Sequence, residues 1–237
     1  MMKMMILAPR RAGMSHAEFR RYVVDVHGPL VKSIVEVAAD IRHYHYNFPV
    51  AGAGDRAFGH PVAELDIVTQ GFFDSREAQL QNMRHPRFMQ YLRPDESNFA
   101  DTARALMHYT DEHEVWPGSM GPAKLFVMRR RAPGLSRSEF QSRWASEFPP
   151  LLEGLPLRGV VTRYVQNYVQ AEAHHPEGSS LRYFDLIDEF WLSSLDAFDS
   201  LAQHGANAAE PIRRLEAECL QVDRTKAFVA EMVPNIP

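Results

Sequence analysis

The sequence of 237 residues has a single cysteine, Cys219, and no long apolar run. One thiol cannot form an internal disulfide, so a packed core must hold the fold, as is typical of proteins in a reducing compartment. The apolar run at the N-terminus breaks at Pro9, too early for the hydrophobic region of a signal peptide. No stretch approaches the roughly 18 apolar residues of a transmembrane helix. We therefore expect a cytoplasmic protein with no membrane partner.

The sequence also lacks an excess of basic residues and a phosphate-binding loop. Lysine and arginine number 26 against 30 acidic residues, which argues against a nucleic-acid partner because such surfaces are strongly basic. The glycines at 52 and 54 are not followed by a helix start, which disfavours a nucleotide cofactor. His43 and His45 share one face of a predicted strand, yet their repeat counterparts, Arg163 and Val165, are not ligands. We expect neither a metal nor a cofactor.

What the chain does contain is an internal repeat. Residues 3–19 (KMMILAPRRAGMSHAEF) align with residues 124–140 (KLFVMRRRAPGLSRSEF). Each copy is long enough to carry its own core, so the repetition indicates a duplicated domain instead of a solenoid. We expect one repeat at residues 1–112 and a second at residues 122–237, joined by a linker at 111–122.

Each repeat shows the same order of strands and helices. A short apolar strand leads through a Pro/Gly turn to Ser-x-x-Glu, at Ser15 and at Ser136, and this capping-box pattern predicts a helix start. Pro29 and Pro150 are expected to end or kink those helices. The remaining predicted elements are strands at 43–48, 64–72, 105–109, 163–168, 183–191 and 226–231, and helices starting near Ser75 and Ser194.

The order strand–helix–strand–strand–helix–strand is the ferredoxin-like plan. Its four-stranded sheet carries helices on one face and leaves the other face uncovered, so two such sheets can close into a barrel. The predicted fold class is α+β, with two ferredoxin-like (βαββαβ) repeats fused into a pseudo-dimeric α+β barrel that holds a cavity. Exposed sheet edges make a homodimer of the fused barrel a further expectation.

Nearly the whole chain resembles the EthD family, as two tandem copies, and the second copy departs from the family's histidine motif. The resemblance is carried by the strand, the turn before Ser15, Glu18-Phe19 and the helix end VHGPL at 26–30, together with the segment from Asp66 to Ser75. It implies the dimeric α+β barrel fold and a small, mostly apolar organic molecule bound in a pocket with few polar groups. The second repeat has Phe148 where the first has His27, so we expect the active site in the first repeat.

His27 is the candidate catalytic residue, because a buried, neutral imidazole can accept a proton near pH 7. Capping of the helix end is its alternative role. Asp66, predicted mid-strand, is a second catalytic candidate that could orient the imidazole. Asp185 repeats Asp66 while His27 is not repeated, which favours a structural role for the aspartate, such as pairing with an arginine.

Three further residues are candidates for substrate binding. Tyr22 and Tyr44 could position a substrate oxygen, although Tyr164 repeats Tyr44 and favours sheet packing as the alternative. His85 ends the predicted second helix, as His204 does in the second repeat, and a histidine there also complements the helix dipole.

The resemblance and these residues together favour cofactor-independent proton transfer on a small hydrophobic organic compound. Elimination, decarboxylation and isomerisation all suit one acid/base histidine with polar groups that hold an oxygen. Two alternatives stay open. One is oxidation, either cofactor-free or haem-assisted, and the other is a non-catalytic ligand-binding accessory protein.

Overall fold

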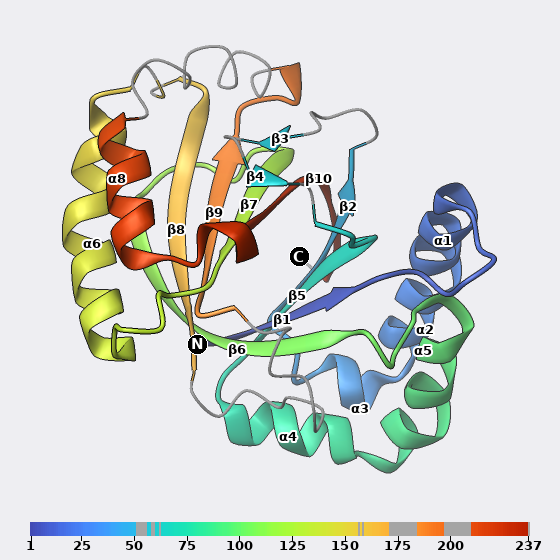
Figure 1. Cartoon of the computed structure of the whole chain (residues 1–237). Coiled ribbons are helices and arrows are strands. Elements are labelled where there is room, and N and C mark those ends of the chain that lie inside the picture. Colours follow the sequence, from blue (N-terminus) through green and yellow to red (C-terminus); the bar gives the residue numbers. More distant parts are fainter. Residues whose placement is uncertain are drawn as a thin grey trace.

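The protein is an eight-stranded antiparallel barrel with helices packed around its outside (Figure 1). The computed structural model describes residues 1–50, 56–57, 60–61, 63–155, 157, 159–170, 184–196 and 210–236. The barrel closes in the order β1-β5-β2-β10-β7-β9-β8-β6. Its strands are β1 (Met2–Ala8), β2 (His43–Pro49), β5 (Ile67–Phe73), β6 (Leu106–Trp116), β7 (Ala123–Arg129), β8 (Val161–Val169), β9 (Leu186–Leu192) and β10 (Lys226–Ile236).

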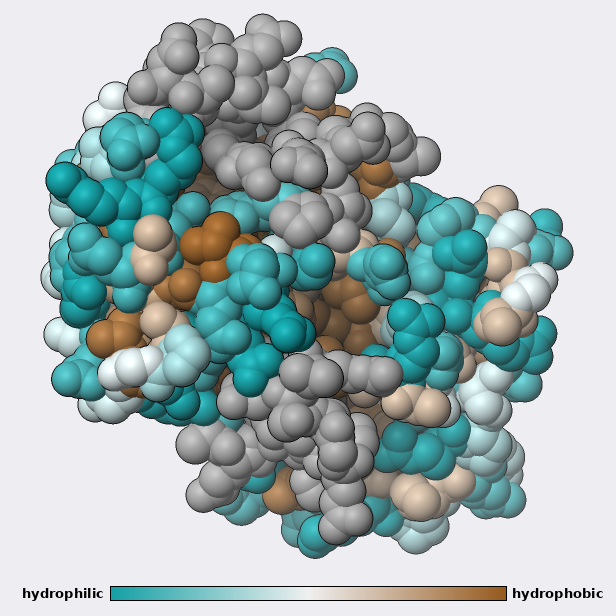
Figure 2. Space-filling model, in the orientation of Figure 1, coloured by the Kyte–Doolittle hydropathy of each residue, from teal (hydrophilic) through white to brown (hydrophobic). Residues whose placement is uncertain are grey.

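The helices form two groups on opposite sides of the barrel in Figure 1, and a short β3–β4 ribbon (Arg56–Ala57 and His60–Pro61) lies near β10. The first half supplies α1 (His16–Tyr22), η1 (Val23–His27), α2 (Gly28–Ser33), α3 (Val35–Ala38), α4 (Arg76–Arg84), η2 (Phe88–Leu92) and α5 (Arg93–Phe99). The second half supplies α6 (Arg137–Glu153), α8 (Glu210–Cys219) and the short η3 (Val222–Arg224). The surface visible in Figure 2 is largely hydrophilic.

Both halves use their strands in the same order. Within the first half the neighbours run β6-β1-β5-β2, and within the second they run β10-β7-β9-β8. The halves meet at two seams, β2 against β10 and β6 against β8. Residues 111–116, predicted as part of the linker, are instead the end of β6 and pair with β8 from Asp111 opposite Tyr168 to Trp116 opposite Tyr164. The prediction failed there because residues 111–114 are polar and exposed, so no hydrophobic alternation marks this part of the strand.

The two predicted helix starts are confirmed. Ser15 and Ser136 each accept a hydrogen bond from the backbone N–H of the glutamate three residues on, and each glutamate carboxylate accepts from the serine N–H. The predicted helix after Ser75 is α4, while the one after Ser194 lies almost wholly outside the described residues.

The prediction for the two prolines was wrong in part. Pro29 lies in the first turn of α2, directly after the π-helical turn η1, and the helical path runs on from α1 through both to Ser33. Pro150 lies inside α6, which continues without a break to Glu153. A proline therefore ended neither helix.

The centre of the barrel holds charged side chains instead of an apolar core alone. Lys3 Nζ lies 2.6 Å from Glu189 Oε2, and Lys124 Nζ lies 2.8 Å from Glu189 Oε1. Gln70 Nε2 donates to Glu189 Oε2 at 2.9 Å. Because β1 and β9 are not neighbours in the barrel, the bond between Lys3 and Glu189 crosses its interior. Burial lowers the pKa of Lys124 to about 8, against the attraction of Glu189.

No helix within the described ranges is long and apolar enough to cross a membrane.

Candidate active site

The first half contains a cavity of about 420 Å³ between the barrel wall and its helices. This volume lies within the roughly 300–1,000 Å³ range of small-molecule sites. Most of the lining is apolar, with a few polar side chains. The polar lining residues are His27, Tyr44, Tyr46, Thr69, Arg93, Glu96 and Thr102. A smaller space of about 40 Å³ adjoins it and shares His27, Tyr44 and Glu96.

His27 lies at the cavity wall in a hydrogen-bonded pair with Asp95. Its Nδ1 donates to Asp95 Oδ2 at 2.8 Å, and the two residues are only 6% and 8% exposed. Tyr22 Oη donates to the other oxygen, Asp95 Oδ1, at 2.6 Å. A carboxylate on Nδ1 fixes the tautomer in which Nε2 is the free basic atom. This geometry leaves Nε2 to exchange a proton with a molecule in the cavity.

Burial alone would raise the pKa of the Asp95 carboxyl, but hydrogen bonds from His27, Tyr22 and Asn98 bring it below its ordinary value. Asp95 is therefore ionised at neutral pH and holds the ring of His27 as an acceptor. Tyr22, predicted to bind substrate, lies behind the pair and positions Asp95 instead of lining the cavity.

Local helix geometry delivers His27 to this position. The residue ends the π-helical turn η1, and Gly28 follows directly. A Cβ atom at Gly28 would lie 2.8 Å from Asn235 Oδ1 on β10, so a larger residue there would require the Asn235 side chain to move. A second π-helical turn, η2, leads into α5, which carries Asp95. Both π-helical turns in the described structure thus flank the cavity, and such turns are frequent at functional sites.

Glu96 is the second carboxyl of α5 and lines the cavity itself. Arg93 Nη1 donates to Glu96 Oε2 at 2.8 Å. Burial raises the pKa of Glu96 above its ordinary value, against the opposing charges of Arg93 and His27. The pKa values of these two adjacent carboxyls are thereby shifted in opposite directions, that of Asp95 downward and that of Glu96 upward.

Tyr44, as predicted, faces the cavity, and so does Tyr46 two residues along the same strand. The two rings pack edge to face with centroids 5.3 Å apart. The Tyr46 hydroxyl is buried and has no hydrogen-bond partner among the described residues. Burial raises the pKa of both phenols, so each keeps its proton as a hydrogen-bond donor.

The structure does not bring Asp66 to His27. Asp66 accepts from the backbone N–H of Arg10 at 2.8 Å, and its carboxylate also pairs with the Arg10 guanidinium and with His16. Asp185 accepts from the backbone N–H of Arg131 at 3.0 Å in the same way. The pairing with an arginine, weighed as the alternative role, is the arrangement that both repeats show.

His85 also lies away from the cavity lining. It caps the C-terminus of α4, and its Nδ1 accepts from the backbone N–H of Arg87 at 3.3 Å. The rings of His43 and His45 are 6.1 Å apart, but no group of three or more His, Cys, Asp or Glu residues in the described ranges could hold a metal ion.

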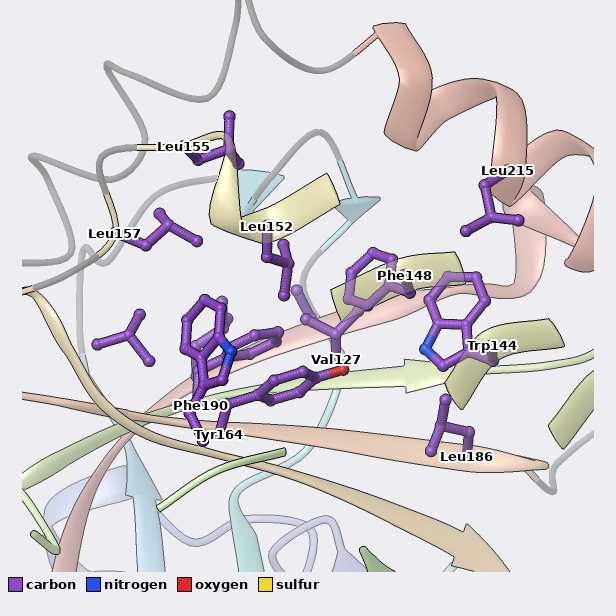
Figure 3. Packing of buried hydrophobic residues seen from close by; sticks show 14 of the residues in the cluster. Val127, Trp144, Phe148, Leu152, Leu155, Leu157, Tyr164, Leu186, Phe190 and Leu215 are labelled. Atoms are coloured by element: carbon purple, nitrogen blue, oxygen red, sulfur yellow. The ribbon is translucent and has the colours of Figure 1, made fainter. Parts of the chain in front are cut away.

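The corresponding place in the second half is filled with aromatic rings (Figure 3). Phe148, the counterpart of His27, stacks on Trp144 with centroids 4.3 Å apart. Tyr164, the counterpart of Tyr44, stacks on Phe190 at 4.3 Å and donates to Asp188 Oδ1 at 2.7 Å. The phenol that faces the cavity in the first half is therefore engaged in packing here.

Sequence reasoning missed Asp95, Glu96 and Tyr46. The segment RPDE at 93–96 shows only a proline and two acidic residues, the ordinary composition of a first helical turn. Asp95 is 68 positions from His27, so no local spacing links them. The one available signal for Tyr46 is that its repeat counterpart is Gln166, which is not aromatic.

The EthD domain family model matches residues 11–103 and 132–217, more than half of the chain. The chain belongs to the EthD family. Two EthD-like segments in tandem agree with the internal repeat and with the doubled strand order.

Similar proteins match less than half of this EthD chain. A conidial pigment biosynthesis dehydratase EthD from Metarhizium robertsii is 31% identical over 110 residues, which are 43% of this chain and 75% of that protein. A dehydratase from Ustilaginoidea virens is 30% identical, and the match covers 43% of this chain and 76% of that protein. A decarboxylase from Passalora fulva is 28% identical, and the match covers 43% of this chain and 70% of that protein.

Solved structures share the barrel at low identity. A mutant chlorite dismutase from Candidatus Nitrospira defluvii has a TM-score of 0.55 at 11% identity, with 99% of this chain and 92% of that chain covered. A dye-decolorizing peroxidase from Bacteroides thetaiotaomicron has a TM-score of 0.54 at 8% identity, and the match covers 97% of this chain and 92% of that chain. At these identities the likeness shows the fold alone.

Proposed function

We propose that this EthD protein is a lyase that removes water from a small hydrophobic carbonyl compound, with His27 as the acid/base residue. The observation that carries the proposal is the His27–Asp95 pair at the wall of a mostly apolar cavity. The names of the similar dehydratases and decarboxylase support the reaction class. We also propose that the two halves are ferredoxin-like repeats fused into a pseudo-dimer, since their strand orders match.

In the proposed reaction His27 Nε2 removes a proton from the carbon beside the carbonyl group. Asp95 stabilises the imidazolium that forms, and Tyr22 holds Asp95 in place. The apolar lining, including Phe99 with its ring centroid 4.7 Å from that of His27, excludes water from the step. The scheme uses no cofactor.

Decarboxylation is the second candidate because Arg93 lines the same cavity. A guanidinium there could bind a substrate carboxylate before its loss as CO₂. Measuring CO₂ release alongside loss of water from the same compound separates the two lyase reactions.

Mass spectrometry of the freshly purified protein, native against denatured, is the first test. A bound organic molecule would identify the ligand class, whereas the mass of haem with a Soret band would favour the haem-assisted oxidation instead.

Turnover is then measured with a β-hydroxytetralone that becomes a naphthol on losing water. We expect His27→Ala to reduce turnover roughly 100- to 10,000-fold, the usual contribution of a general base. The matched control is His113→Ala, an exposed histidine on β6, which should turn over normally. Ligand binding without turnover in the unmodified protein would support the accessory-protein alternative.

A further inference from the structure

Elimination of water needs a second proton-transfer group, because hydroxide is a poor leaving group and leaves far more readily as water. Within the described structure, Glu96 is the carboxyl that lines the cavity beside His27. One of its oxygens, Oε2, accepts from Arg93, and Oε1 has no hydrogen-bond partner among the described residues. The side chain is 24% exposed, so this free oxygen is accessible from the cavity.

The groups around Glu96 come from three elements. Arg93 and Asp95 lie on its own helix, His27 ends η1, and Tyr44 lies on β2. Asp95 directs its carboxylate to His27 Nδ1, while Glu96, one position on, directs its carboxyl into the cavity. The first turn of α5 thus supplies one carboxylate that orients the base and one carboxyl that can act on the substrate.

We propose that Glu96 delivers the proton to the departing hydroxyl group, so that the site takes carbonyl compounds whose hydroxyl lies β to the carbonyl group. This inference rests on the proposed dehydration at the same site. The two proton-transfer groups, His27 and Glu96, match two positions of such a substrate: the carbon between the two functional groups, and the hydroxyl.

The step balances without a co-reactant. His27 Nε2 takes the proton from the carbon between the two groups, and the C–H electron pair becomes the new C=C bond. The C–O bond breaks with its electron pair on oxygen, which takes the Glu96 proton and leaves as water. Proton return from the imidazolium to the Glu96 carboxylate, through the released water, restores both groups.

The test compares two leaving groups on the same tetralone ring. Glu96→Gln is expected to lower turnover of the β-hydroxytetralone roughly 100- to 10,000-fold, the usual contribution of a general acid. A β-fluoro analogue expels fluoride, which depends far less on a proton donor, so Glu96→Gln should turn it over within a few-fold of the unmodified protein. Equal losses on both compounds would overturn the role of Glu96.

His27→Ala serves as the second arm and separates the two proposals. It should lose turnover of both compounds, because both need the carbon proton removed. If His27→Ala keeps its turnover, the proposed function fails. If His27→Ala is inactive while Glu96→Gln processes both compounds normally, only the role of Glu96 fails.

Circular dichroism and urea unfolding of each variant confirm that it is folded.

Discussion

At the scale of single residues, the Tyr46 hydroxyl is buried in the described protein without a hydrogen-bond partner. Tyr46→Phe removes a buried hydroxyl that makes no hydrogen bond in the described protein. We therefore expect the free energy of unfolding to stay the same or to rise by about 1 kcal/mol. Tyr164→Phe is the matched change, and it removes the 2.7 Å hydrogen bond to Asp188. We expect that variant to lose about 1–3 kcal/mol. Urea unfolding of both variants measures the difference, and an equal loss in both would mean that Tyr46 is satisfied in the folded protein.

Asp66 was a catalytic candidate from the sequence, and the structure shows the alternative role, pairing with an arginine. Its carboxylate holds Arg10 and His16 at the end of β1, so Asp66→Ala should lower the free energy of unfolding by about 1–3 kcal/mol. Turnover per folded molecule should not change, since Asp66 does not line the cavity. Kinetics normalised to the folded fraction provide the check. A selective loss of turnover would restore the catalytic role predicted from the sequence.

At the scale of elements, the helix that follows the first strand differs between the halves. In the first half it contains a π-helical turn and presents His27 to a cavity, whereas α6 is regular and buries Phe148 against Trp144. Phe148→Ala should therefore lower the free energy of unfolding by about 3–5 kcal/mol, as expected for a closely packed aromatic residue. His27→Ala borders existing space and should cost less. Thermal unfolding of the two variants side by side measures this, and a smaller cost for Phe148→Ala would contradict the close packing in Figure 3.

The elements also show why sequence reasoning succeeded where it did. Helix starts at Ser15 and Ser136 depend on residues three positions apart, so the sequence alone predicts them. The partner of His27 comes from a helix 68 positions away, and its selection depends on how α5 packs against η1. Local patterns therefore predicted the strands and the caps, while the pairing of Asp95 with His27 required the tertiary structure.

At the scale of the whole molecule, the barrel centre joins the two halves through one carboxylate. Lys3 and Lys124 occupy equivalent positions in the repeats, yet both pair with Glu189, because the first half has Gln70 at the matching position. Glu189→Gln leaves Lys124 buried without its ion pair and should cost about 3–5 kcal/mol in the free energy of unfolding. Moving the charge with the double change Gln70→Glu and Glu189→Gln should recover much of that loss.

Urea unfolding of the single and double variants decides this prediction. No recovery in the double variant would mean that the two sides of the barrel centre are not interchangeable despite the repeat. Lys3 provides an internal comparison, because Glu112 lies 3.0 Å from its Nζ and remains after either change.

The two halves that meet at the seams β2–β10 and β6–β8 belong to one chain, and this has a genetic consequence. When identical chains assemble a paired structure, each mutation appears in both copies, so a histidine needed in one pocket cannot be exchanged for a phenylalanine in the other. In this chain, positions 27 and 148 are separate codons within one reading frame, although they occupy equivalent places. One half is thereby free to evolve toward rigidity while the other keeps its cavity, and the gene transmits that asymmetry as a unit.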